Sequence, residues 1–159
     1  MTRKIVVGLD GSEHALRAVD KVIERRAAGE DVEIHLLNVQ IPVQSGHARM
    51  FVSHDDLQEY YRGEGLAALA AARRRLEERG IPHAHHVAVG HVAQTIAQFA
   101  VDHHCDEIVV GTHGHTALAH LLLGSVAADL VRESRVPVTL IEAFPSDDTP
   151  ACGGDSGLT

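Results

Sequence analysis

The chain has 159 residues, of which 45% are hydrophobic and 23% are charged, the balance typical of one globular domain. No apolar run approaches the ~18 residues that a membrane span requires, and the N-terminal residues show no secretory signal, so we expect a cytoplasmic protein without a membrane span. A formal net charge of −8 and an aromatic content of 3% argue against nucleic-acid binding, which favours a basic surface and base-stacking side chains.

Thirteen histidines and two cysteines are the residues that invite a metal site. One group is His83, His85 and His86, and the other is His103, His104 and Cys105. Neither group has the spacing of zinc ligands, and neighbouring residues on a strand point to opposite faces. We therefore predict no metal site and a surface position for most histidines. Cys105 and Cys152 form no close motif.

The N-terminal third predicts a strand, a helix and a second strand. Residues 4–9 form a nearly continuous apolar run, typical of a strand buried on both faces. Asp10, Gly11 and Ser12 then interrupt the run and open a helix. The apolar stripe of that helix is Leu16, Val19 and Ile23, and Ala28-Gly29 ends it. The second strand covers residues 32–39.

The middle of the chain predicts a loop and a long helix. Residues 41–54 contain proline, serine and glycine without apolar periodicity, which indicates a long loop. Asp55 or Asp56 is expected to cap the following helix, and Gly80 to end it. The expected apolar stripe of this helix consists of Leu57, Tyr61, Gly65, Leu69, Ala72 and Leu76.

The remaining elements alternate in the same way. Strands are predicted over residues 83–89, 107–111 and 137–141, and helices after Gly90-His91 and from Ser125 to about Glu133. The residues from 146 to 159 are rich in Asp, Gly, Ser and Pro, which indicates a disordered tail after a single domain of residues 1–145.

This alternation predicts an α/β fold, a five-stranded parallel sheet with helices on both faces. Ligands of such sheets bind beyond the carboxyl ends of the strands, where the strand order reverses. Four residues fall at or just after expected strand ends: Asp10, Val39, Gly90 and Gly111. The ligand site is therefore expected at this edge of the sheet.

The stretch from Gly111 to Ser125 predicts a phosphate site. Gly111, Gly114 and Gly124 allow close approach of the backbone. Ser125 is expected to be the N-cap of a helix whose first N–H groups suit an anion. The chain contains neither the Gly-x-x-x-x-Gly-Lys-Ser/Thr nor the Gly-x-Gly-x-x-Gly pattern, so a P-loop protein is excluded and a dinucleotide dehydrogenase is disfavoured. Asp10 has no evident carboxylate partner, which also disfavours a phospho-acceptor receiver domain.

The pattern Gly111-x2-Gly114-x9-Gly124-Ser125 closely resembles the ATP-binding signature of the universal stress protein family. Residues 4–12 resemble the first strand and turn of that family, and Val136-Pro137-Val138 the entry to its last strand. The resemblance covers about residues 3–143. It implies a Rossmann-like fold of the adenine nucleotide alpha hydrolase type that binds ATP, with ADP or AMP as other ligands and Mg²⁺ beside the phosphates. It also implies a homodimer paired through Val138, Thr139, Leu140 and Ile141.

The resemblance assigns roles to individual residues. Asp10 would contact the ribose, the backbone of Val39 would meet the adenine edge, and the glycine stretch would surround the phosphates. The complete set of expected nucleotide-binding residues is Gly8, Leu9, Asp10, Gly11, Ser12, Val39, Gly90, Gly111, His113, Gly114, His115, Gly124, Ser125 and Val126.

The chain departs from the family at His115 and His120, where relatives often have Arg or Lys. Because only a protonated imidazole carries charge, phosphate affinity is expected to rise as the pH falls toward the histidine pKa. No convincing general base or nucleophile accompanies the glycines, although His113 could orient a water.

The sequence therefore favours a regulatory, nucleotide-dependent protein of the stress response, with an unknown regulated partner. The alternatives are a slow ATP hydrolase or nucleotidyl-transfer enzyme on the same scaffold, and a nucleotide-free dimeric interaction module.

Overall fold

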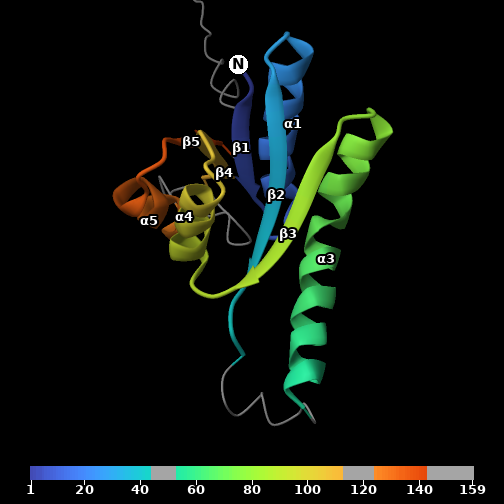
Figure 1. Ribbon diagram of the computed structural model, residues 1–159, viewed down its shortest axis with the longest axis vertical. Helices are drawn as coiled ribbons and strands as arrows, with labels where there is room; N and C mark the ends of the chain where they lie inside the picture. Colours follow the sequence, from blue (N-terminus) through green and yellow to red (C-terminus); the bar gives the residue numbers. More distant parts are fainter. Residues whose placement is uncertain (44–52, 113–123, 143–159) are drawn as a thin grey trace, which may run out of the picture.

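A computed structural model describes residues 1–43, 53–112 and 124–142. Five parallel strands form one sheet in the order β3-β2-β1-β4-β5 (Figure 1). The strands are β1 (Arg3–Gly8), β2 (Val32–Gln40), β3 (His83–Val89), β4 (Glu107–Gly111) and β5 (Val138–Ile141). The helices are α1 (Glu13–Ala27), α3 (His54–Glu78), α4 (Val92–Asp102) and α5 (Ser125–Glu133). The predicted five-stranded parallel sheet is confirmed.

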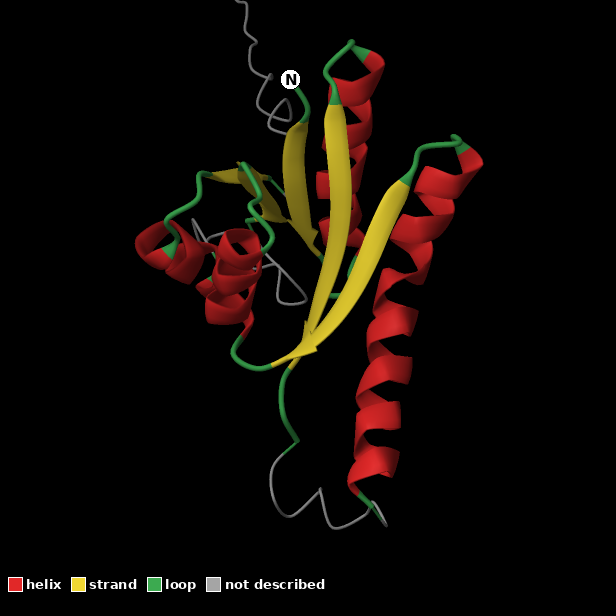
Figure 2. Ribbon diagram, in the orientation of Figure 1, coloured by secondary structure: helices red, strands yellow, loops and turns green. Residues whose placement is uncertain are grey.

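Helices cover both faces of the sheet, as the alternation of elements predicts. Helices α1 and α3 pack on one face, and α4 and α5 lie together on the other (Figure 2). Each face has its own apolar core. Strand β1 contributes to both cores. Ile5 and Val7 pack in the core under α1 and α3, and Val6 packs in the core under α4 and α5. All three are fully buried, which explains why this strand reads as a continuous apolar run.

The buried faces of helices α3 and α1 match the apolar stripes predicted from the sequence to different degrees. In α3 the buried residues are Tyr61, Gly65, Leu69, Ala72 and Leu76, five of the six expected. In α1 the most buried residues are Ala15, Ala18, Val19 and Val22, while Leu16 and Ile23 are only partly buried. The small residues of α1 therefore face the sheet, and the larger ones flank them.

Two helix starts differ from the predictions. Ser53, not Asp55 or Asp56, is the N-cap of α3, and its hydroxyl accepts from the backbone N of Asp56 at 3.1 Å. Gly124 is the N-cap of α5, so Ser125 is its first helical residue. Ser12 caps α1, as expected. An N-cap depends on where the chain leaves the extended conformation, so sequence predicts it only to within a few residues.

Three predictions concern residues outside the described ranges: the central part of the loop over residues 41–54, the middle of the glycine stretch and the tail over residues 146–159. Of the helices in the described ranges, none is long and apolar enough to cross a membrane.

Candidate functional site

A cleft of about 570 Å³ lies at the carboxyl ends of the central strands. It occurs where the strand order reverses, because β1 connects forward to β2 on one side and pairs with β4 on the other. In open parallel sheets this position leaves a crevice between diverging loops. The cleft is lined by the ends of β1, β2 and β4, by α4 and by the first turn of α5. Its lining includes the predicted residues Gly8, Leu9, Asp10, Val39, Gly111, Gly124, Ser125 and Val126.

Gly8 forms part of the cleft lining at the end of β1. A Cβ atom at this position would lie 3.0 Å from Cδ1 of Ile96 and 3.0 Å from Cγ1 of Val110. Side chains from α4 and β4 therefore occupy the space that a larger residue would need. Glycine lets the layers close beneath the cleft while β1 still ends at its edge.

Asp10 lines the cleft directly after β1. Its Oδ1 atom accepts from the backbone N of Ser12 at 2.9 Å and from the Ser12 hydroxyl at 2.6 Å. The Ser12 Oγ atom in turn accepts from the backbone N of Ala15 at 3.2 Å and caps α1. Ser12 does not line the cleft. Its contacts orient Asp10 and begin the helix, so the turn and capping functions coexist with a residue that lines the cleft.

Val39 lies on β2, two residues beyond the last point where β2 pairs with β1. The register ends at Gly8 and Leu37, and the backbone N of Leu9 donates to the carbonyl of Leu37 at 2.9 Å. Backbone groups alternate in direction along a strand, so the N–H and C=O of Val39 face the same side as those of Leu37. At that level β1 has already ended, which aims the Val39 backbone at the cleft.

The two described residues that flank positions 113–123 are hydrogen-bonded to each other. The backbone N of Gly124 donates to the carbonyl of Thr112 at 2.6 Å, and the N of Thr112 donates to the carbonyl of Ile141 at 2.9 Å. These bonds tie Thr112 to β5 and Gly124 to Thr112. The predicted site residues His113, Gly114 and His115, and also His120, lie outside the described residues.

Gly11 and Gly90 were expected in the site but do not line the cleft. Gly11 has φ +88°, and a Cβ there would lie 3.3 Å from Cα of Ala68 on α3. Its glycine is required by the left-handed backbone and by close packing. The backbone N of Gly90 donates to the carbonyl of Gln40 at 3.0 Å. Both residues shape the loops around the cleft.

Two buried polar residues in the lining were not singled out from the sequence. Asn38 is 3% exposed and Thr112 is 7% exposed, and both line the cleft. The signal for Asn38 was present, because an amide interrupts the apolar run Leu36-Leu37-Asn38-Val39. A buried polar side chain within a strand requires hydrogen-bond partners, and such a requirement is typical of a site at the strand end.

The charge of the cleft comes from few groups. Asp10 is the only ionisable residue among the described residues that line it. Ser125 and Val126 begin α5, where backbone N–H groups and the helix dipole favour an anion. The described part of the cleft thus combines an acceptor for hydroxyls with N–H donors for an anion.

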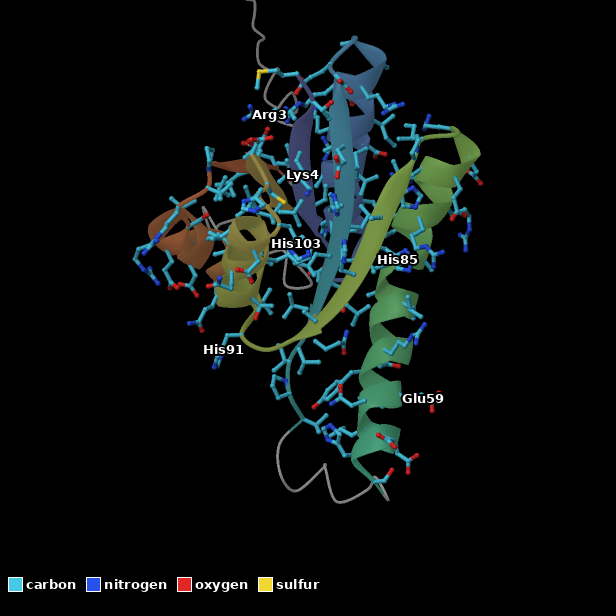
Figure 3. The ribbon with its side chains drawn as sticks, viewed as in Figure 1. Arg3, Lys4, Glu59, His85, His91 and His103 are labelled. Atoms are coloured by element: carbon cyan, nitrogen blue, oxygen red, sulfur yellow. The ribbon has the colours of Figure 1, made fainter. Side chains whose placement is uncertain are left out.

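Among the described residues, histidines lie on both faces of the sheet. Figure 3 shows His85 beside α3, and His103 lies at the C-terminal end of α4 on the other face. His86 shares the second face, where Nδ1 of His35 lies 3.1 Å from its Nε2 and Phe99 stacks on His103. Burial, with neighbouring His35, lowers the pKa of His86. Within the described ranges, no three His, Cys, Asp or Glu side chains are grouped to hold a metal ion, and Cys105 is buried.

The fold and the cleft at the strand ends define a Rossmann-like α/β protein. The chain belongs to the universal stress protein family, whose model matches residues 1–142. The chain is 30% identical to Universal stress protein MJ0531 of Methanocaldococcus jannaschii over 146 residues, covering 88% of this chain and 82% of the relative.

Solved structures agree with this assignment. Protein MJ0577 of the same organism has a TM-score of 0.71 and 26% identity, covering 88% of this chain and 95% of the other. A universal stress protein solved in complex with cAMP has a TM-score of 0.62 and 26% identity, covering 89% and 98%. The resemblance predicted from the glycine pattern is therefore confirmed at the level of the family.

Proposed function

We propose that this chain binds an adenine nucleotide in the cleft and acts as a regulatory protein of the stress response in the cytoplasm. The observation that carries the proposal is the lining of the cleft, which combines the Asp10 carboxylate with the first turn of α5. A carboxylate suits ribose hydroxyls, and a helix N-terminus suits phosphates. The cAMP complex of the related stress protein supports the same class of ligand.

ATP is the preferred ligand in this proposal, with ADP and AMP as weaker ones, because the complete Gly111-Gly114-Gly124-Ser125 pattern accompanies the cleft. The described lining offers one carboxylate. Mg²⁺ commonly binds through substrate phosphates and only one or two carboxylates, so a magnesium ion would arrive with the nucleotide and be held chiefly by its phosphates.

The output is conformational rather than catalytic in this proposal. Catalysis of hydrolysis needs a positioned base within hydrogen-bond reach of the attacking water. Among the described lining residues only Asp10 is ionisable, and it is assigned to the ribose. The nucleotide would act by binding one conformation or assembly of the protein more tightly than another.

The test is calorimetry of the purified protein with ATP, ADP, AMP and cAMP, with magnesium, after mass spectrometry under native conditions to detect co-purified nucleotide. We expect Asp10→Ala to weaken ATP binding by about tenfold or more, since a hydrogen bond to a charged group contributes ~1.5–3 kcal/mol. Gly114→Val is expected to abolish binding.

Asp102→Ala is the matched control, because Asp102 is an exposed acid at the end of α4 and does not line the cleft. It should bind ATP as the unmodified protein does. Absence of binding by any adenine nucleotide would refute the proposal and favour the nucleotide-free interaction module. Multiple turnovers of ADP release that Gly114→Val abolishes would favour the hydrolase.

A further inference from the structure

Two amide side chains near the end of β2 are connected in series. Nδ2 of Asn38 donates to the backbone carbonyl of Leu9 at 2.8 Å, and Nε2 of Gln40 donates to Oδ1 of Asn38 at 2.7 Å. Asn38 is 3% exposed and Gln40 is half-buried. Both residues line the cleft. The pair therefore links the loop that carries Asp10 to the far end of β2.

The orientation of both amides follows from the first bond. A carbonyl oxygen only accepts, so Asn38 must turn its NH₂ group toward Leu9 and its oxygen toward Gln40. Gln40 must then turn its own NH₂ group toward Asn38. Rotation of either amide would bring two oxygen atoms together. The Oε1 atom of Gln40 is consequently fixed as the end of the series, and it is an acceptor.

We propose that Gln40 selects purines with an amino group at position 6 and that Asn38 is the positioning residue that fixes its orientation. This inference rests on the proposed nucleotide site. Val39, which lies between the two amides, directs its backbone to the space beyond the end of β1. A base edge at Val39 lies next to Gln40, whose oxygen would accept from the amino group of adenine.

A 6-oxo purine presents the opposite chemistry. The oxygen of hypoxanthine would face the Gln40 oxygen, and neither atom can donate. Sites built to bond a substrate N–H discriminate strongly against an analogue that lacks it, because their own polar groups are left unpaired. Gln40 is only half-buried, so water can compensate in part, and we expect a discrimination of about tenfold, the scale of one neutral hydrogen bond.

The experiment compares the dissociation constants of ATP and ITP. The two bases differ in the group at position 6, which is amino in ATP and oxo in ITP, and in the protonation of N1. The unmodified protein is expected to bind ATP about tenfold more tightly. Gln40→Met keeps the length of the side chain and removes the acceptor, so the preference for ATP should fall severalfold, with the remainder supplied by the Val39 backbone, while ITP affinity stays within about twofold. Gln58→Met is the matched control: Gln58 is exposed on α3 and does not line the cleft. It should keep the ratio.

The positioning role of Asn38 is tested by Asn38→Leu, which removes the amide oxygen that accepts from Gln40 with little change in size. We expect the ATP-to-ITP ratio to fall although Gln40 is intact. Circular dichroism establishes whether this buried variant is folded, and if it is not, Gln40→Met alone decides the inference.

Two results separate this inference from the proposed function. Equal affinities for ATP and ITP in the unmodified protein, or an unchanged ratio in Gln40→Met, would overturn the role of Gln40 and leave the nucleotide site standing. Failure of the unmodified protein to bind either nucleotide would refute the proposed function and this inference with it.

Discussion

Glu107 is a buried carboxylate that accepts four hydrogen bonds, and it lies at the start of β4, away from the cleft. It is 4% exposed. Its carboxylate accepts from Arg3 at 2.7 Å, from Arg25 at 2.9 and 3.0 Å and from the hydroxyl of Thr139. The residue therefore connects β1, α1 and β5 to β4. Because β4 leads directly to Gly111 and Thr112, this network contributes to the placement of these two residues at the cleft.

The pKa of Glu107 predicts an acid-dependent loss of stability. Burial raises this pKa, but the bonds from Arg25, Thr139 and Arg3 together lower it from 4.5 to about 2. Because the pKa of Glu107 is lower in the folded than in the unfolded protein, the group stabilises the fold above pH 4.5. This stability is lost as the pH falls from 4.5 toward 2. The difference corresponds to about 3 kcal/mol at 1.36 kcal/mol per pKa unit.

Glu107→Gln tests this prediction through the free energy of unfolding in urea, measured from pH 6 to pH 3. The variant should be less stable at pH 6 and should lose less stability on acidification than the unmodified protein. Glu59→Gln, at an exposed position on α3 (Figure 3), is the control and should follow the unmodified curve. Parallel curves for the unmodified protein and Glu107→Gln would contradict the assignment.

At the scale of elements, the spacing between α3 and β3 depends on one glycine. A Cβ at Gly65 would lie 2.6 Å from Cγ2 of Val87 and closer still to its Cγ1. Gly63, on the same helix, has nothing within 4 Å of the equivalent position. The first glycine therefore allows the helix to approach the sheet, whereas the second is only a weak helix former.

These two glycines give opposite predictions for the same substitution. Gly65→Ala should lower the free energy of unfolding by ~1–3 kcal/mol through overpacking, and Gly63→Ala should raise it by up to ~1 kcal/mol through helix propensity. Chemical denaturation measures both. Val87→Ala should restore part of the loss in Gly65→Ala, and a lack of rescue would show that the helix and strand are not limited by this contact.

At the scale of the whole molecule, β5 forms one edge of the sheet. The carbonyl of Pro137 accepts from Ile108 in β4 and that of Ile141 from Thr112 just after β4, so the backbone groups of Val138 and Leu140 alternate to the outer side. The side chains of all four strand residues are half-buried. An exposed edge strand needs a cover or a partner, and the homodimer through Val138, Thr139, Leu140 and Ile141 remains a proposal that would supply one.

Sedimentation velocity tests the proposed dimer. We expect a species of twice the 17.1 kDa chain mass, and we expect Leu140→Pro to shift it toward the monomer, because proline removes an outward N–H. Circular dichroism controls for folding of the variant. A monomer at all micromolar concentrations in the unmodified protein would refute pairing through β5.

The sequence alone determined the order of elements, the parallel sheet, the stripe of α3 and the family. Those features depend on apolar periodicity and on short motifs, which are local properties of the chain. It also placed Asp10, Val39, Gly90 and Gly111 at one edge of the sheet, because the carboxyl ends of parallel strands meet there.

Only the tertiary structure decided how these neighbours are used. It assigned Gly11 to contact with α3 rather than to the cleft, and Gly65 to contact with β3. It also brought the Leu9 carbonyl to Asn38 and thereby oriented Gln40. These contacts join residues far apart in the chain, and they depend on where β1 stops relative to β2 and on how closely the helices approach the sheet, which no local pattern encodes.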